Sequence, residues 1–387
     1  MKFETAAVHA GEEPLTQTGK FGDVAMPIHL SSTFARKVPT EPTEGFEYSR
    51  TGNPTRLALE RKLAAIESAK FALAFSSGSA AETTILLSLL RTGDTILASD
   101  DLYGGTRRLL VNMSSNFGLR LLFSDFTSPD KVKGAMREKP KMVWYETPSN
   151  PLMKIIDIAL ISEMCSEAGA LSVVDNTFAT PYFQMPLGMG ADIVLHSTTK
   201  YLNGHSDSVG GALITDNDDL HEKLKFYQNA GGAILSPFDS YLTLRGIKTL
   251  HARMPIHERN ASSIASFLSG HRMVKKMYYP GLDSHPGHAI AKKQMRGFGG
   301  MLSFVMDSDQ AAVSRFLGSL KVFYLAESLG GVESLIEVPA LMTHASVPEN
   351  ERNKLGISNS LIRVSAGIES DTDLISDLKD ALESVAD

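Results

Sequence analysis

Asp192-Ile193-Val194-Leu195-His196-Ser197-Thr198-Thr199-Lys200 joins an apolar run to a hydroxyl-rich loop that carries one lysine. The run at residues 193–195 predicts a buried strand, and the loop would present Ser197, Thr199 and Lys200 at the end of that strand. A lysine placed there either pairs with a phosphate or, where its surroundings hold it neutral, acts as a nucleophile that forms a Schiff base.

A second run of the same kind, Leu171-Ser172-Val173-Val174-Asp175-Asn176-Thr177, lies earlier in the chain and ends in an acid. We expect Asp175 at the same edge of the sheet as Lys200. A lysine, a carboxylate and nearby hydroxyls fit pyridoxal phosphate (PLP), because the lysine binds its aldehyde and the carboxylate pairs with its pyridinium nitrogen. A structural ion pair at a sheet edge fits the spacing equally well, so the spacing alone leaves both interpretations open.

The segments at residues 175–181, 196–201 and 204–207 closely resemble the γ-subfamily of fold-type I PLP enzymes, the cystathionine lyases and synthases of cysteine and methionine metabolism. The resemblance extends over nearly the whole chain. It implies PLP as the cofactor, Lys200 as the Schiff-base lysine and Asp175 as the partner of the ring nitrogen.

Strands and helices alternate over the first two thirds of the chain, which predicts an α/β fold with a mostly parallel, doubly wound sheet. Apolar runs predict strands at residues 71–75, 95–98, 119–123, 142–145, 171–174, 193–195 and 211–215. Periodic patterns predict helices between them, at residues 55–68, 80–90, 104–116, 131–138 and 158–168. The resemblance implies that the sheet has seven strands and belongs to a fold-type I, PLP-dependent transferase-like domain.

The pattern changes in the last third of the chain, where a smaller α+β domain is expected. We predict a helix at residues 250–268 that Pro255 interrupts, and strands at residues 300–306 and 361–365. A final helix should begin with a capping box of Ser370 and Asp373 and carry an apolar face of Leu374, Leu378, Leu382 and Val385.

Three parts are therefore expected along the chain. Residues 1–52 are rich in glycine and proline but carry apolar anchors, so we expect an arm that contacts a neighbouring subunit. Residues 53–240 form the PLP-binding domain and residues 241–387 the C-terminal α+β domain.

Composition excludes several classes of protein. A chain of 387 residues, 43% hydrophobic and 21% charged, is typical of a globular protein with two or three packed domains. A net charge of −6 without a basic patch argues against nucleic acid as a partner. We find no signal peptide and no apolar run long enough to span a bilayer. The single cysteine, Cys165, excludes an intrachain disulfide and favours a reducing, cytoplasmic compartment.

The phosphate of the cofactor needs donors, and a strand, a glycine-containing turn and a helix near residue 78 would supply backbone N–H groups. We expect Gly78 and Ser79 to contribute there, with hydroxyls from Ser197 and Thr199. The resemblance adds Thr177 as a cofactor contact, and it implies that Tyr48 and Arg50 reach the phosphate of the adjacent subunit. On this view the active unit is at least a dimer, and a homotetramer is usual in the family.

The resemblance also supplies the substrate side of the site. Tyr103, in Tyr103-Gly104-Gly105-Thr106, would stack on the cofactor ring and exchange a proton with the substrate or the leaving group. Arg363 would grip the substrate α-carboxylate with Asn150 beside it. Further substrate-binding candidates are Arg108, Glu327, Ser328 and Thr343, and Glu327 would pair with the distal ammonium of cystathionine. His285 and His288 are not expected to bind metal, because no carboxylate or thiol with ligand spacing accompanies them.

Within the subfamily, the segments at residues 103–108, 327–335 and 342–348 look most like those of the γ-lyases. The β-lyases tend to have an aromatic residue where Leu329 stands, and methionine γ-lyases usually have a cysteine where Gly105 stands. The resemblance therefore implies γ-elimination of L-cystathionine to cysteine, 2-oxobutyrate and ammonia. A γ-synthase or an O-acylhomoserine sulfhydrylase would use the same residues. A PLP-binding regulatory protein without important turnover is a third interpretation, and a poor one, since no catalytic position is missing.

Overall fold

The computed structural model describes residues 1–14 and 22–385 of the chain. It divides into two compact units, of which the first comprises residues 1–91 and 192–251 and the second residues 92–191 and 252–387. Each unit is built from segments that are distant in the sequence.

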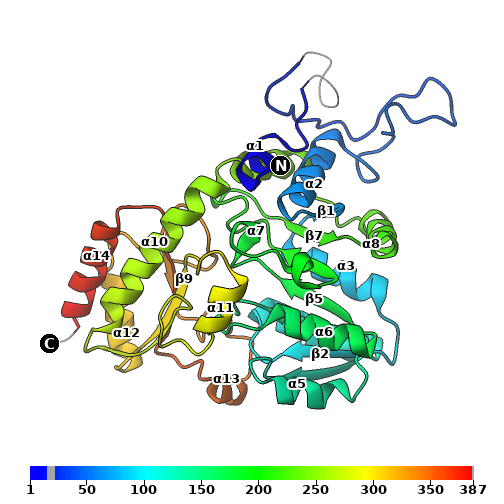
Figure 1. Ribbon diagram of the computed structural model, residues 1–387. Coiled ribbons are helices and arrows are strands. Elements are labelled where there is room, and N and C mark those ends of the chain that lie inside the picture. Colours follow the sequence, from blue (N-terminus) through cyan, green and yellow to red (C-terminus); the bar gives the residue numbers. More distant parts are fainter. Residues whose placement is uncertain (15–21, 386–387) are drawn as a thin grey trace. The chain divides into compact units, whose positions relative to one another are not determined.

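The first unit combines the N-terminal segment with three strands and the helices that flank them (Figure 1). Its helices are α1 (Phe3–His9), α2 (Pro54–Ile66), α3 (Gly78–Leu89), α8 (Asp218–Gly231) and α9 (Pro237–Ile247). Its strands are β1 (Phe71–Phe75), β6 (Ile193–His196) and β7 (Gly211–Thr215). Strand β7 pairs antiparallel with both β1 and β6.

Helix α2 begins where the sequence predicts a start. Pro54 occupies the first turn, and the Asn53 side chain accepts hydrogen bonds from the backbone N–H groups of Thr55 (2.9 Å) and Arg56 (3.3 Å). These bonds satisfy two donors that a helix start leaves without partners.

Helix α1 was not expected, because residues 1–50 show little periodicity. Its small apolar face, Phe3, Ala6 and Ala7, is buried, and a buried cation adds hydrogen bonds to it. Lys62, in α2, donates hydrogen bonds to the carbonyls of Ala7 (2.9 Å) and Val8 (3.0 Å) and forms an ion pair of 2.7 Å with Glu12. Lys248 pairs with the other oxygen of Glu12 at 2.8 Å. These bonds tie the segment after α1 to the body of the first unit.

The second unit contains the parallel strands and their crossover helices (Figure 1). In chain order these are β2 (Thr95–Ser99), α4 (Gly104–Phe117), β3 (Arg120–Ser124), α5 (Pro129–Met136), β4 (Met142–Glu146), α6 (Ile158–Ala168), β5 (Leu171–Asp175), α7 (Thr180–Phe183) and a 3₁₀ turn, Pro186–Met189. Strand β2 lies parallel to β3 and β4, and β4 lies parallel to β5. Val143, Tyr145 and Val174 pack with Ile161 and the buried thiol of Cys165 in the core beneath α6.

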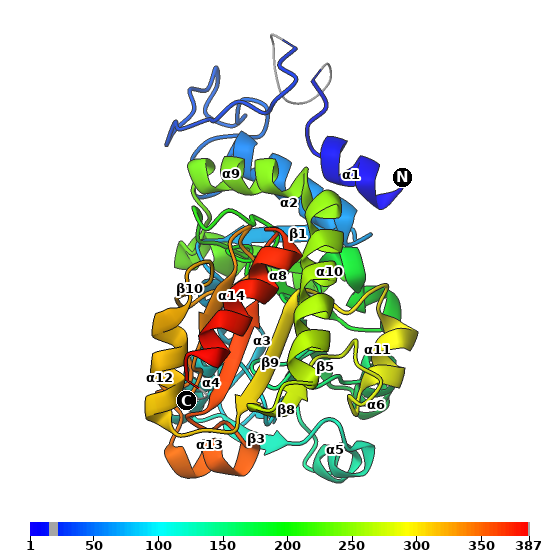
Figure 2. The ribbon, with the colours of Figure 1, turned by 90° about the vertical axis from the view of Figure 1, so that its left-hand side faces the viewer.

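A five-stranded sheet and the helices beside it complete the second unit. Its elements are α10 (Leu250–Ser269, in this unit from residue 252), β8 (Val274–Tyr278), α11 (His288–Gln294), β9 (Met301–Met306), α12 (Gln310–Ser319), β10 (Tyr324–Leu325), β11 (Leu335–Glu337), α13 (Glu349–Leu355), β12 (Leu361–Ser365) and α14 (Asp371–Glu383). Figure 2 shows α10, α12 and α14 on one face of this sheet. Leu268, Phe316 and Leu378, one from each helix, are buried in the core that they form with β9 and β12.

The strand orders are β1-β7-β6-β5-β4-β2-β3 for the larger sheet and β10-β11-β12-β9-β8 for the smaller one. The predicted α/β class and seven-stranded sheet are confirmed, although β7 pairs antiparallel with both β1 and β6. The apolar face of the last helix is confirmed, since Leu374, Leu378 and Leu382 are fully buried. Its capping box is wrong, because the Ser370 side chain makes no capping hydrogen bond.

The predicted division into an arm (residues 1–52), a PLP-binding domain (53–240) and a C-terminal domain (241–387) stays a prediction. The two compact units follow different boundaries. No helix in residues 1–14 and 22–385 is both long and apolar enough to cross a membrane.

Candidate active site

The turn that carries Lys200 follows β6 directly. His196, the last residue of the strand, forms a hydrogen bond through Nε2 with the Glu67 carboxylate, and both side chains are buried. The backbone N–H of Lys200 donates to the Ser197 carbonyl (3.2 Å), and the N–H of Gly204 donates to the Lys200 carbonyl (2.8 Å). These contacts fix the backbone on both sides of Lys200, which is half-buried. A fixed backbone is what a reactive side chain needs if it is to keep one orientation.

Three of the predicted phosphate-binding residues lie together in the first unit. The backbone N–H groups of Gly78 and Ser79 come before the first intrahelical hydrogen bond of α3, so they are available to an anion. A Cβ atom on Gly78 would lie 3.2 Å from the Cβ of Ser197, which places the Ser197 hydroxyl beside this helix start. Two N–H groups and a hydroxyl form a donor set that fits a phosphate group.

Thr199 differs from Ser197 in its hydrogen bonds. Its hydroxyl donates to the Gly210 carbonyl (3.2 Å) and accepts from the Gly210 N–H (3.0 Å). The single proton of this hydroxyl is therefore directed at the backbone of its own unit, and its contact with the phosphate stays a prediction.

Tyr48 and Arg50 are exposed and contact each other. The Arg50 guanidinium lies 5.5 Å from the centre of the Tyr48 ring, and its Nη1 donates to the Asn229 carbonyl at 2.9 Å. The planar fork of Arg50 is chemically suited to phosphate. The expected contact with a neighbouring subunit stays a prediction.

In the second unit, the ends of β4 and β5 place two carboxylates side by side. Glu146 and Asp175 are paired residues in the parallel register. Asp175 Oδ1 accepts the backbone N–H of Thr177 (2.9 Å), and Glu146 Oε1 accepts the backbone N–H of Tyr103 (2.7 Å). Glu146 therefore fixes the start of the segment that carries the predicted catalytic tyrosine.

Two glycines shape the start of α4 around Tyr103. A Cβ atom on Gly105 would lie 2.3 Å from Cε1 of the Tyr103 ring, and one on Gly104 would lie 2.4 Å from the Thr343 carbonyl oxygen. The ring thus folds over Gly105, and the segment with Thr343 packs against Gly104. Tyr103 keeps 39% of its surface exposed, so the ring remains accessible to a ligand.

Arg363 lies at the centre of a buried polar group in the second unit. Its Nη1 donates to Asn150 Oδ1 (3.0 Å) and pairs with Glu337 Oε1 (3.0 Å), and its Nη2 donates to the Ser328 carbonyl (2.7 Å). Thr343 Oγ1 donates to the same oxygen of Glu337 (2.7 Å). Four predicted substrate-binding residues, Arg363, Asn150, Ser328 and Thr343, are therefore joined in one hydrogen-bonded group.

His344 connects this group to the segment before Tyr103. Its Nε2 lies 3.2 Å from the carbonyl oxygens of both Leu102 and Asn150, so Nε2 is the nitrogen that carries the proton. Burial lowers the pKa of His344 to about 4, which keeps the ring neutral near pH 7. A neutral histidine thus holds two loops that carry predicted site residues.

The remaining candidates are not joined to this group. The side chains of Arg108 and Glu327 are exposed and make no hydrogen bond or ion pair within residues 1–14 and 22–385. Sequence reasoning missed Glu146, Glu337 and His344, which position the predicted residues. The signal was present for Glu337, because an acid ending the apolar strand Leu335-Ile336-Glu337 needs a buried partner. Among the described residues, no three His, Cys, Asp or Glu side chains lie close enough together to hold a metal ion.

The comparisons with known proteins all point to one family of enzymes. A family model described as Cys/Met metabolism PLP-dependent enzyme matches residues 4–383. Cystathionine gamma-lyase from Dictyostelium discoideum is 52% identical over 382 residues, which cover 99% of this chain and 98% of that protein. Cystathionine beta-lyase from Coxiella burnetii (strain RSA 493 / Nine Mile phase I) is 53% identical over 382 residues, which cover 98% of this chain and 97% of that protein.

A solved structure resembles the whole chain as well. It is cystathionine gamma synthase from Xanthomonas oryzae pv. oryzae in complex with cystathionine, with a TM-score of 0.97, 46% sequence identity, and coverage of 100% of this chain and 98% of that one. The three relatives carry names of three different reactions at similar identity, so the comparisons establish the family and not the reaction. The chain belongs to the Cys/Met metabolism family of PLP-dependent enzymes.

Proposed function

We propose that the protein catalyses the γ-elimination of L-cystathionine to cysteine, 2-oxobutyrate and ammonia. The observation that carries this proposal is the buried group around Arg363, which presents a guanidinium and an amide suited to an α-amino acid carboxylate. The name of the Dictyostelium discoideum relative, 52% identical over nearly the whole chain, supports the choice of reaction.

We propose that Lys200 holds PLP covalently and that Asp175 keeps the pyridine nitrogen protonated. The phosphate would be held by the N–H groups of Gly78 and Ser79 and by Ser197, with Thr177, Thr199, Tyr48 and Arg50 as further contacts. When bound, PLP withdraws electrons from the carbons next to the substrate nitrogen and so makes their protons removable. Lys200, once released and neutral, takes the Cα proton as a general base.

The second unit supplies the groups that orient the substrate. We propose that Arg363 and Asn150 bind the α-carboxylate and that the Glu327 carboxylate pairs with the distal ammonium. Ser328, Arg108 and Thr343 complete the proposed substrate contacts. Tyr103 is within reach of water on its exposed side and would give its hydroxyl proton to the departing γ-thiolate.

Two features favour this reaction over the γ-cleavage of methionine and the β-elimination of cystathionine. A cysteine at position 105, as in methionine γ-lyases, would place its Cβ within 2.3 Å of the Tyr103 ring as it lies here. Leu329, which is buried, stands where β-lyases tend to carry an aromatic side chain. Both observations support cleavage at Cγ of a cystathionine substrate.

A γ-synthase or an O-acylhomoserine sulfhydrylase is the second candidate, and the similarity to the Xanthomonas oryzae synthase favours it. Such an enzyme would start from an activated homoserine ester and add cysteine or sulfide at Cγ. The same lysine, arginine and tyrosine would serve both reactions, so only products distinguish them.

A product assay on purified protein tests the proposal. One tube contains L-cystathionine alone, and another contains an O-acylhomoserine with cysteine. We expect 2-oxobutyrate and cysteine to accumulate rapidly in the first tube and little cystathionine to form in the second. Faster formation of cystathionine in the second tube would identify a synthase, and pyruvate with homocysteine in the first would identify a β-lyase.

The assignment of Lys200 is tested by borohydride reduction followed by digestion and mass spectrometry. Wild-type protein should yield PLP attached to the peptide that contains Lys200, and Lys200→Ala protein should yield no PLP-modified peptide. Lys223→Ala, which removes an exposed lysine of α8, serves as the control and should label like wild type. Labelling of another lysine in wild-type protein would refute the assignment.

We further propose a homo-oligomer with shared sites, at least a dimer and up to a tetramer. If Arg50 serves the site of a neighbouring subunit, Arg50→Ala and Lys200→Ala proteins should each be nearly inactive. Mixing them after mild dissociation should restore activity, because some sites then combine an intact Arg50 with an intact Lys200. No recovery in verified mixed oligomers would place both residues in the site of one subunit.

A further inference from the structure

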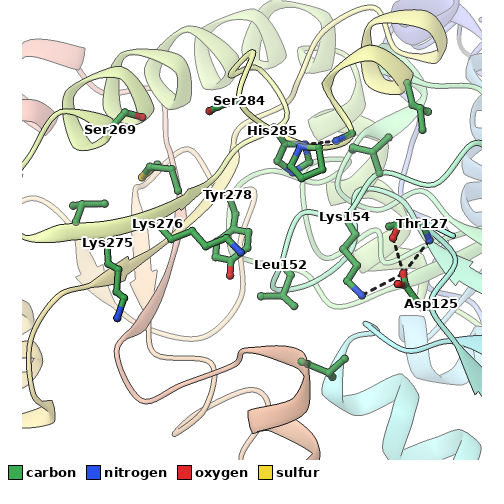
Figure 3. Close-up of a pocket in the computed structure, with 17 residues that line it drawn as sticks. Asp125, Thr127, Leu152, Lys154, Ser269, Lys275, Lys276, Tyr278, Ser284 and His285 are labelled. Carbon is green, nitrogen blue, oxygen red and sulfur yellow. Dashed lines mark hydrogen bonds and ion pairs between the residues drawn. The ribbon is translucent and has the colours of Figure 1, made fainter.

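A pocket of about 670 Å³ lies in the second unit, apart from the group around Arg363 (Figure 3). Its walls come from the loops at residues 125–127 and 152–155, strand β8, and the segment at residues 284–290 that leads into α11. We call it the β8 pocket. Its volume is within the range of small-molecule sites, which is roughly 300–1,000 Å³.

The formal charge of the pocket lining is positive, although the chain as a whole carries −6. Lys154, Lys275 and Lys276 line it against a single acid, Asp125. His285 adds no charge near pH 7, because burial lowers its pKa to about 4 and its Nδ1 accepts the N–H of Gly287. Three lysines and one aspartate leave two positive charges.

The acid of the pocket already has its partners. Asp125 Oδ1 accepts the N–H (3.1 Å) and the hydroxyl (2.6 Å) of Thr127, and its carboxylate pairs with Lys131 at 3.3 Å. Lys154 lies between Asp100, at 2.8 Å, and Asp125, at 3.8 Å. This wall is therefore internally neutralised, and Figure 3 shows Lys154 and Thr127 turned toward Asp125.

The opposite wall is not neutralised. Lys275 and Lys276 form no ion pair with any residue in 1–14 or 22–385, and Lys276 Nζ lies 4.6 Å from the centre of the Tyr278 ring. The aromatic face attracts the ammonium but carries no formal negative charge to pair with it. The surplus charge of the pocket is thus concentrated on these two adjacent lysines.

Strand β8 carries a β-bulge at these two lysines. In a regular strand, Lys275 and Lys276 would point to opposite faces of the sheet. Here Val274 pairs with Met306 and Lys276 with Val305, so the register shifts and Lys275 is the extra residue. Bulges of this kind redirect side chains and recur beside functional sites.

The rest of the lining is apolar or carries hydroxyls. Met277 and Ile290 are half-buried and provide the apolar surface, with the buried Leu152 and Ile155 behind them, and Ser269 and Tyr278 provide hydroxyls. A ligand that fits this surface has an apolar body and an anionic group, because a bare inorganic anion would leave the apolar surface uncovered.

We propose that the β8 pocket binds a small organic anion, a phosphate monoester or a carboxylate, whose charge pairs with Lys275 and Lys276 and whose body packs on Met277 and Ile290. This site is separate from the residues proposed for catalysis. The inference does not depend on which reaction the enzyme performs.

Isothermal titration calorimetry on the PLP-loaded protein tests the proposal with defined probes. Phenyl phosphate and benzoate share an apolar ring and differ in the anionic group, phenol lacks the charge, and inorganic phosphate lacks the ring. We expect one or both of the ring-bearing anions to bind, and phenol and inorganic phosphate to bind at least about tenfold more weakly. The stronger of the two anions identifies the ligand class.

Charge reversal locates the site. Lys275→Glu/Lys276→Glu should weaken the better probe at least about tenfold, which is ~1.4 kcal/mol. The matched control, Lys292→Glu/Lys293→Glu, makes the same change on two adjacent exposed lysines of α11 and should bind like wild type. Ser284→Trp, at an exposed position of the pocket lining, should block binding without changing any charge.

The proposal is overturned if none of the probes binds wild-type protein. It is equally overturned if the Lys275→Glu/Lys276→Glu and Ser284→Trp proteins both keep wild-type affinity, since the probe then binds elsewhere. If the charge-reversed protein fails to fold, Ser284→Trp alone decides between these outcomes. All readouts are binding measurements, so they stand whether or not cystathionine is the substrate.

Discussion

Tyr103 and Gly105 restrict each other at the start of α4, because a Cβ at position 105 would lie 2.3 Å from the ring. Gly105→Ala should displace the ring and lower kcat/KM for cystathionine by at least about tenfold, roughly 1.4 kcal/mol of transition-state stabilisation. Gly134→Ala is the matched control, since it makes the same change inside α5 where no atom lies within 4 Å. Steady-state kinetics with thermal melting checks both, and equal activity in the two variants would contradict the expectation.

Arg363 uses both Nη atoms, and a lysine offers a point charge without that fork. Arg363→Lys should therefore raise KM for the amino acid substrate by roughly tenfold or more, since it loses the bonds to Asn150 and Ser328 that orient the group. It should still fold, because a cation remains beside the buried Glu337. An unchanged KM in a folded Arg363→Lys protein would remove Arg363 from substrate binding.

At this scale, sequence reasoning identified residues whose chemistry a cofactor or substrate would need, such as Lys200, Asp175 and Arg363. It missed Glu146, Glu337 and His344, which position other site residues: Glu146 holds the Tyr103 backbone, Glu337 pairs with Arg363, and His344 joins two loops. A positioning residue is recognised by its partners, and Leu102 and Asn150 are joined by His344 only in three dimensions. No spacing in the chain encodes such a contact.

Helix α1 is attached to the first unit through the Glu12 carboxylate, which pairs with Lys62 and Lys248. Burial alone would raise the pKa of Glu12, but the hydrogen bonds from Lys248 and Lys62 outweigh it and lower the pKa below its ordinary value of 4.5. A carboxyl group with a lowered pKa in the folded state stabilises that state above pH 4.5 and loses this effect as the pH falls through the lowered value.

Glu12→Gln should therefore destabilise the protein at pH 7, by roughly 3 kcal/mol, because it removes the carboxylate that pairs with the buried Lys62. The difference from wild type should shrink as the pH falls below 4.5, where Glu12 itself takes up a proton. Denaturant unfolding at both pH values measures this, and Glu4→Gln, which makes the same change at an exposed residue of α1, is the control. A difference that does not change with pH would show that the ion pairs are not its source.

Elements with strong apolar patterns were predicted well. Strands β1, β7 and β12 match the predicted ranges, because short apolar runs between turn residues leave few alternatives. Helix α1 was missed since its attachment depends on Lys62, far away in the sequence. The bulge in β8 was equally invisible, because it depends on the register with β9.

At the scale of the whole molecule, the N-terminal segment carries apolar side chains that the single chain does not cover. Val24 is 84% exposed and Leu30 72%. If the proposed homo-oligomer forms, a neighbouring subunit should bury them, so Val24→Asp/Leu30→Asp should lower the mass in solution while circular dichroism stays unchanged. Light scattering after gel filtration checks the mass. Lys379→Asp, on the exposed side of α14, is the control, and an unchanged mass in the double variant would refute the expectation.

The single cysteine of the chain is buried in the core beneath α6. A thiol reacts as the thiolate and needs solvent access, so maleimide reagents should leave the native protein unlabelled. Labelling at Cys165 therefore requires that core to open. The labelling rate under native conditions measures how often the second unit unfolds locally around α6. For the same reason, a cysteine introduced at any exposed position would be the one reactive thiol of the native protein, and a fluorophore placed there needs no cysteine-free background.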